Sequence, residues 1–269
     1  MIRSFRRALA GFVVHQGFFL AAGVSFFFLI CLVPLLFLIV ATAGFVLSSE
    51  AAAQAVLTHL SGLVPVYRKE LKEVLSQIIA ARGLSGILGT IILLFFSTQL
   101  FAALRFVTNV IFGVTQGRGW MRGTLYDMGM VFLMGGLFLA SVALTDLLEW
   151  LRIFIMAPAG VPRAWSRAMS IALGLAFSMG LFFVTYRYFP NRKVPVLPAL
   201  AGAVLASALW ETAKQLFRWY IVSLGVYDQI YGALGVLVAL SMFAYYTGIV
   251  FILGAEYAAA LEETLAPQP

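Results

Sequence analysis

Ionisable side chains are scarce in this sequence. Its 269 residues include 18 Lys and Arg and 11 Asp and Glu, so charged residues make up 11% of the chain while 62% are apolar. A soluble domain carries about 25% charged residues. Because so little charge cannot cover a water-facing surface, the composition excludes a soluble enzyme, a nucleic-acid-binding domain and a disordered chain.

Metal-binding and redox-active residues are equally few. The one cysteine, Cys31, lies inside an apolar run, so the chain cannot form an intrachain disulfide. The two histidines, His15 and His59, are far apart, and no His, Cys or Asp cluster has the spacing of a zinc site. The sequence also lacks a P-loop and a dinucleotide fingerprint. We therefore expect no metal, no cofactor, no nucleic-acid partner and no enzymatic activity.

What the chain does contain is a series of long apolar runs. A helix advances about 1.5 Å per residue, so about 20 apolar residues cross a hydrocarbon core of about 30 Å. Six stretches meet this requirement, at about residues 18–47, 84–104, 125–147, 168–188, 197–217 and 234–258. They predict an all-α polytopic membrane protein with about six transmembrane helices. We expect one integral membrane domain over residues 1–269, with the lipid bilayer as its partner.

The first run, at about residues 18–47, is too long to stand upright in a bilayer. It follows Arg3, Arg6 and Arg7 as a signal peptide would, but the apolar part of a signal peptide has only about 7 to 15 residues. An uncleaved anchor is therefore favoured. Pro34 removes one helical hydrogen bond, so we expect a tilt or a helix kink there.

An insert with a different pattern, at about residues 50–81, separates the first two runs. Apolar residues recur at helical spacing from Tyr67 to Ile78, and charged residues occupy the other side. This pattern predicts an amphipathic helical insert. It could lie on the membrane surface or cap the bundle, and a lid over a pathway is the alternative.

The connecting segments indicate the orientation. With the N-terminus inside, the inner and outer segments each hold nine Lys and Arg residues, so the plain count is a tie. Four of the outer nine belong to the long insert, which is translocated with less regard to charge. We therefore expect both the N- and the C-terminus in the cytoplasm.

Charges within the spans are the first candidates for function, because a charge in hydrocarbon costs roughly 2.5 to 3.5 kcal/mol. Glu211, Lys214 and Arg218 share one helix face in the fifth span. Glu211 is too short to reach the interface, so it should pair with Lys214 or face a polar cavity. The alternatives are an ion pair that stabilises the helix and a pathway for a solute or a proton.

Four other charges lie near the predicted cytoplasmic ends of four spans: Arg105, Asp127, Arg187 and Glu256. The two arginines could extend to the interface at little cost. Alternatively, all four meet as a gate or binding ring at the inner mouth. Asn109 is one helical turn beyond Arg105 and could share its polar face.

A series of short segments occurs in this order along the chain: Ala22-Gly23-Val24-Ser25-Phe26-Phe27 with Pro34-Leu35, Leu100-Phe101-Ala102-Ala103-Leu104-Arg105 with Asn109, Tyr186-Arg187-Tyr188-Phe189-Pro190-Asn191-Arg192, Gly202-Ala203, Trp210-Glu211 with Lys214 and Tyr220, Tyr231-Gly232, and Gly254-Ala255-Glu256. Together these segments resemble the YihY/BrkB family of bacterial inner-membrane proteins, and the resemblance covers nearly the whole chain. The chain differs from the family pattern at Phe26 and Phe27, where tyrosines are usual, and near Cys31, where a serine is usual.

The resemblance implies a multi-pass protein of the bacterial inner membrane. Members have been labelled ribonuclease BN, serum-resistance factors or virulence factors. The ribonuclease label fits poorly, because phosphodiester hydrolysis generally needs metal-binding carboxylates or an acid–base pair in water. We expect a secondary transporter, an exporter of a small polar or anionic solute, whose pathway residues are Glu211, Lys214, Arg105, Asn109, Arg187 and Glu256. The alternative is a non-transporting scaffold for envelope integrity, and a homo-oligomer is left open.

Overall fold

The computed structural model describes residues 2–47, 82–115, 119–151, 163–223 and 233–265. These residues form seven α-helices and no strand. The helices are α1 (Ile2–Val14), α2 (Gly17–Leu47), α5 (Arg82–Ile111), α6 (Trp120–Leu151), α7 (Arg163–Tyr188), α8 (Val196–Ser223) and α10 (Ala233–Leu265). The predicted amphipathic insert lies outside the described residues.

The six long helices cover the six apolar runs of the sequence. They have between 26 and 33 residues, so even α7 has a length of about 39 Å. Within the described residues, four helices are apolar enough over their length to cross a membrane: α2 at Gly17–Leu35, α5 at Gly89–Ile111, α8 at Val196–Phe217 and α10 at Leu237–Leu265. This confirms the prediction of an all-α polytopic membrane protein.

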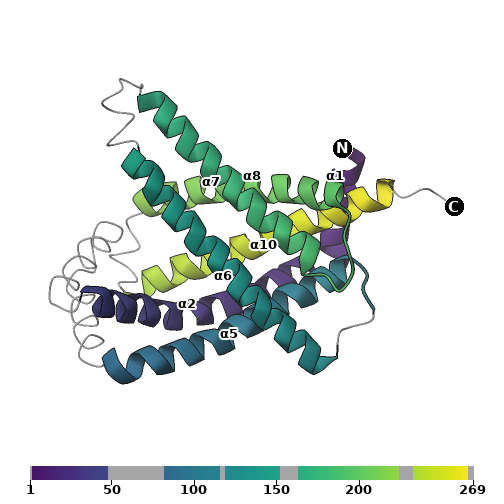
Figure 1. The fold of residues 1–269 in the computed structure, drawn as a ribbon. Helices are drawn as coiled ribbons and strands as arrows, with labels where there is room; N and C mark the ends of the chain where they lie inside the picture. The colour runs from purple at the N-terminus through teal and green to yellow at the C-terminus, as the bar shows by residue number, and fades with distance from the viewer. Residues whose placement is uncertain (1, 48–81, 116–118, 152–162, 224–232, 266–269) are drawn as a thin grey trace.

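The first element, α1, is a separate helix that the sequence reasoning treated only as a basic flank. Gln16 has a positive φ of 54°, and the chain changes direction there between α1 and α2. The N–H of His15 still bonds the carbonyl of Gly11, and the carbonyl of Gln16 accepts the N–H of Phe19, so each helix is closed at the break. As Figure 1 shows, α1 runs across the long axes of α2 and α10.

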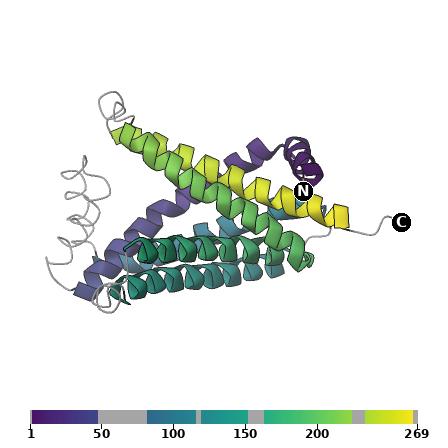
Figure 2. The same ribbon diagram turned by 90° about the horizontal axis from the view of Figure 1, so that it is seen from above.

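Helix α2 continues through Pro34 to Leu47, and Pro34 is buried. Its neighbours along most of its length are α5 and α10, while α10 also packs against α8, and α8 against α7. In both views α8 and α10 run side by side (Figure 2). The flexing of α2 at Pro34 stays a prediction.

The helices approach one another most closely at one end of the bundle. This end, which we call the terminal end, holds residues 2–17, 111–115, 119–120, 188–196 and 258–265, so the described part of the chain begins and ends there (Figure 1). Gly202 lets α8 and α10 touch, because a Cβ at this position would lie 2.5 Å from the carbonyl oxygen of Gly254. Gly254 in turn leaves room for the hydroxyl of Tyr186.

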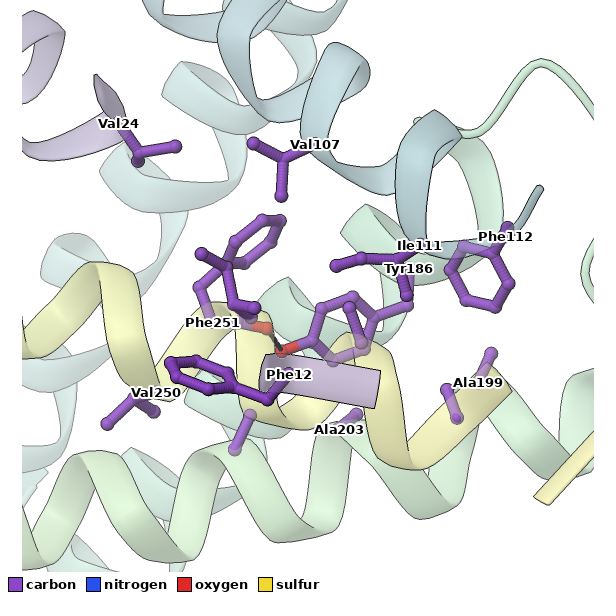
Figure 3. Close-up of a cluster of buried hydrophobic side chains, with 14 of the residues drawn as sticks. Phe12, Val24, Val107, Ile111, Phe112, Tyr186, Ala199, Ala203, Val250 and Phe251 are labelled. Atoms are coloured by element: carbon purple, nitrogen blue, oxygen red, sulfur yellow. Dashed lines mark hydrogen bonds between the residues drawn. The ribbon is translucent and has the colours of Figure 1, made fainter. Parts of the chain in front are cut away.

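The main apolar core lies in this half of the molecule. Phe12, Val107, Ile111 and Phe251 gather around the ring of Tyr186 (Figure 3). The hydroxyl of Tyr186 is fully buried and donates a hydrogen bond of 2.8 Å to the carbonyl oxygen of Phe251. Because this core joins α1, α5, α7 and α10, it holds the terminal end together as one packed unit.

Candidate functional site

Arg105 on α5 and Asp127 on α6 form an ion pair with two hydrogen bonds, which joins the two helices. The Nε and Nη2 atoms of Arg105 donate to the two carboxylate oxygens of Asp127 at 2.7 and 2.8 Å. The side chain of Asp127 is 1% exposed and that of Arg105 is 17% exposed. Gly123 provides the space, since a Cβ there would lie 3.0 Å from Nη2 of Arg105. The guanidinium therefore already has a carboxylate partner.

Glu256 on α10 pairs with a residue that the sequence reasoning did not use. One of its carboxylate oxygens lies 2.7 Å from Nδ1 of His15, at the break between α1 and α2. The Glu256 side chain is 4% exposed, and it lies directly against the backbone of Gly11, where a Cβ would collide with the carboxylate. This contact attaches α1 to α10.

Arg187 and Asn109 both bind the backbone of the turn between α7 and α8. Nη1 of Arg187 donates to the carbonyl of Val194 at 2.8 Å, and Oδ1 of Asn109 accepts the backbone N–H of Asn191 at 2.8 Å. The same turn is attached to α10 by Arg192, which makes a two-bond pair with Glu262 at 2.6 and 2.9 Å. These side chains fix the path of the chain between two helices.

The four charges near the predicted inner ends therefore do not meet as one ring. Arg105 and Asp127 contact each other, whereas Arg187 and Glu256 have separate partners. Among the described residues, no group of three or more His, Cys, Asp and Glu side chains is placed to hold a metal ion.

Glu211 and Lys214 form a pair of their own within α8. Nζ of Lys214 lies 2.6 Å from Oε1 of Glu211, and the two side chains are 39% and 28% exposed. Lys214 is 18 residues beyond the start of α8, about 27 Å along the helix and away from the terminal end. Trp210, one turn before Lys214, packs against Phe243 of α10 with ring centres 5.3 Å apart.

Residues 8–269 match the protein family described as Virulence factor BrkB. The chain belongs to this family. Relatives include a UPF0761 membrane protein of Alkalilimnicola ehrlichii, 30% identical over 90% of this chain and 54% of its own length. A second, from Pelodictyon phaeoclathratiforme, is 28% identical over 91% of this chain and 56% of its own length. A third, from Aeromonas salmonicida, is 31% identical over 76% of this chain and 69% of its own length.

These relatives are named as membrane proteins, in agreement with the long apolar helices. The chain spans little more than half the length of the first curated relatives it matches. No solved structure matches the chain. The comparisons therefore identify the chain as a membrane protein of the BrkB family.

Proposed function

We propose that this BrkB-family chain is a secondary transporter of the bacterial inner membrane that exports a small polar or anionic solute. In this proposal both termini are cytoplasmic and the chain has no catalytic activity. The observation that carries it is the Glu211–Lys214 pair, because Lys214 continues the packed face of α8 and yet is accessible.

The position of Lys214 on α8 supports a polar space beside its side chain. Lys214 follows Ser207 by seven residues and Ala203 by eleven, so the three side chains point to nearly the same side of the helix. Ala203 is fully buried and Ser207 is 2% exposed, whereas the Lys214 side chain is 39% exposed. The face that is packed near the terminal end is therefore open further along α8. An ammonium group facing lipid there would be costly, so the opening is better filled by water.

The chemistry of the pair suits an anionic solute. An ammonium group is a compact positive charge with three donors, and it can bind a carboxylate or a phosphate in place of Glu211. Protonation of Glu211 would release Lys214 for that exchange, which would couple solute binding to a proton. Arg105 is less suited to the task because Asp127 already takes two of its donors.

Cysteine accessibility tests the open space directly. In a Cys31→Ser background, Lys214→Cys should react with a membrane-impermeant thiol reagent added to reconstituted vesicles. Ser207→Cys is the matched control, since it lies two turns away on the same face and is buried. Equal protection of both positions would contradict a water-filled route at Lys214.

Flux measurements test whether Glu211 and Lys214 take part in the transport of an anionic solute. Proteoliposomes loaded with a pH-sensitive dye would be given succinate, glutamate or inorganic phosphate as probes. Glu211→Gln and Lys214→Met should each lower the flux of any probe that the wild type moves, while Lys193→Met, an exposed charge at the terminal end, should not. If both pair variants match the wild type for every transported probe, the proposed roles are wrong.

A scaffold for envelope partners is the second candidate, and one observation favours it. Near the terminal end, Arg105, Arg187 and Glu256 each have a protein partner, as side chains in a rigid support would. A scaffold predicts that Lys214→Cys is protected from the aqueous reagent. The labelling experiment therefore separates the two functions.

A further inference from the structure

The N-terminal helix α1 lies in an orientation that differs from the spans. It runs across the ends of α2 and α10 at the terminal end, and it is seen nearly end-on in the view in which α8 and α10 lie lengthwise (Figure 2). Because the long helices cross the bilayer, α1 lies along the membrane surface at the terminal end. A helix placed there contacts water, headgroups and acyl chains at once.

The residues of α1 divide into three faces. Ser4, Ala8 and Phe12 are buried, at helical spacing, and form the face that packs into the bundle. Phe5, Leu9 and Val13 recur every four residues on a second face and are exposed. The third face carries the exposed residues Arg3, Arg6, Arg7 and Ala10, with the exposed Val14 at its C-terminal end.

Helix α1 is also held firmly in this position. His15, directly after the helix, pairs with the buried carboxylate of Glu256, and Gly11 lies against the same carboxylate. The ring of Phe12 packs edge-to-face on Phe18 at the start of α2, with centres 5.0 Å apart. The bundle therefore fixes the direction in which the two remaining faces point.

From this arrangement we propose that α1 is an interfacial helix that binds anionic phospholipid headgroups. Phe5, Leu9 and Val13 enter the boundary between headgroups and acyl chains, and the adjacent arginines contact phosphate groups. Three exposed guanidinium groups beside an apolar stripe complement a negatively charged lipid surface. Arginine can bind phosphate with two parallel hydrogen bonds. The proposal does not depend on transport, and so the two can fail separately.

A depth measurement tests the orientation of the helix. In the full chain with Cys31→Ser, an environment-sensitive fluorophore would be attached to Leu9→Cys or, as the matched control, to Ala10→Cys. These neighbours are about 100° apart around the helix, on the apolar and the basic face respectively. In vesicles, spin-labelled acyl chains should quench the probe at position 9 much more than the probe at position 10. Equal quenching, or quenching of position 10 alone, would overturn the proposal.

A measurement of retained lipid tests whether the arginines of α1 bind anionic headgroups. The protein would be extracted from vesicles of mixed phosphatidylglycerol and phosphatidylcholine, and the bound lipids measured by mass spectrometry. Replacing Arg3, Arg6 and Arg7 with glutamine should lower the ratio of retained phosphatidylglycerol to phosphatidylcholine at least about five-fold, whereas three lysines should largely preserve it. A glutamine variant that keeps the ratio of the lysine variant would refute the proposal.

A salt series on the wild type provides the same test without a variant. Exposed charges are screened over about 3 Å at 1 M salt and about 10 Å at 0.1 M. The enrichment in phosphatidylglycerol should therefore fall as salt is raised during extraction. An enrichment that salt does not change would show that the exposed arginines do not cause it.

Discussion

Replacing Arg105 with methionine should strongly destabilise the packing of α5 against α6. Methionine has an unbranched side chain similar to the aliphatic stem of arginine, but it lacks the guanidinium. It leaves the Asp127 carboxylate, which is 1% exposed, without the two donors that now lie 2.7 and 2.8 Å from its oxygens. The carboxylate cannot reach water by a small movement because Asp127 is much shorter than arginine.

The size of the effect follows from the burial of each partner. Removing one member of a buried ion pair costs about 3 to 5 kcal/mol, because the charge left behind is uncompensated. Asp127→Asn should cost less, since the remaining Arg105 side chain is 17% exposed and long enough to turn toward the interface. Replacing both residues with Met and Leu removes both charges at once, and that double variant should lie within about 1 kcal/mol of the wild type.

Thermal unfolding of detergent-purified protein, followed by the loss of its monodisperse chromatography peak, would rank the four proteins. We expect the order wild type, double variant, Asp127→Asn and Arg105→Met, from most to least stable. If Arg105→Met unfolds at the wild-type temperature, the pair is not buried as the structure describes. If the double variant is as unstable as Arg105→Met, the two residues do not act through each other.

Two further substitutions test the packing near the terminal end. Gly202→Ala should cost about 1 to 3 kcal/mol, because its Cβ would lie 2.5 Å from the Gly254 carbonyl, while Gly174→Ala, with nothing within 4 Å, should be neutral or slightly stabilising. Equal melting temperatures for these two variants would place α8 and α10 further apart than described. Tyr186→Phe should cost about 1 kcal/mol through the lost bond to the Phe251 carbonyl, and an unchanged melting temperature would argue against that bond.

The apolar runs alone predicted the long helices because crossing hydrocarbon is a local requirement. Every peptide group in lipid must bond within its own helix, so hydropathy and length are sufficient to place the helices. The separate helix α1 was missed because its basic residues were interpreted only as a topology signal. The spacing of Ser4, Ala8 and Phe12 could have revealed it, since these side chains recur every four residues.

Side-chain partners were predictable only where they are close in sequence. The Glu211–Lys214 pair follows from residues three apart on a helix. His15 and Glu256 are separated by 241 positions, and only the packing of α1 on α10 brings them together. Asn109 and Asn191 likewise meet across α5 and the turn after α7. Without an alignment or a structure, no physical rule assigns such partners.

The two kinds of ion pair in this protein should therefore respond differently to substitution. Arg105 and Asp127 lie on different helices, so their bond resists any movement of α5 against α6. Glu211 and Lys214 lie on one helix and move together, so their bond leaves α8 free to move and contributes only about 0.2 to 0.5 kcal/mol to its stability. An intramembrane charge pair that stabilises so little is poorly explained by structure alone. In the proposed transport function, contact with a polar solute would offset its cost in hydrocarbon.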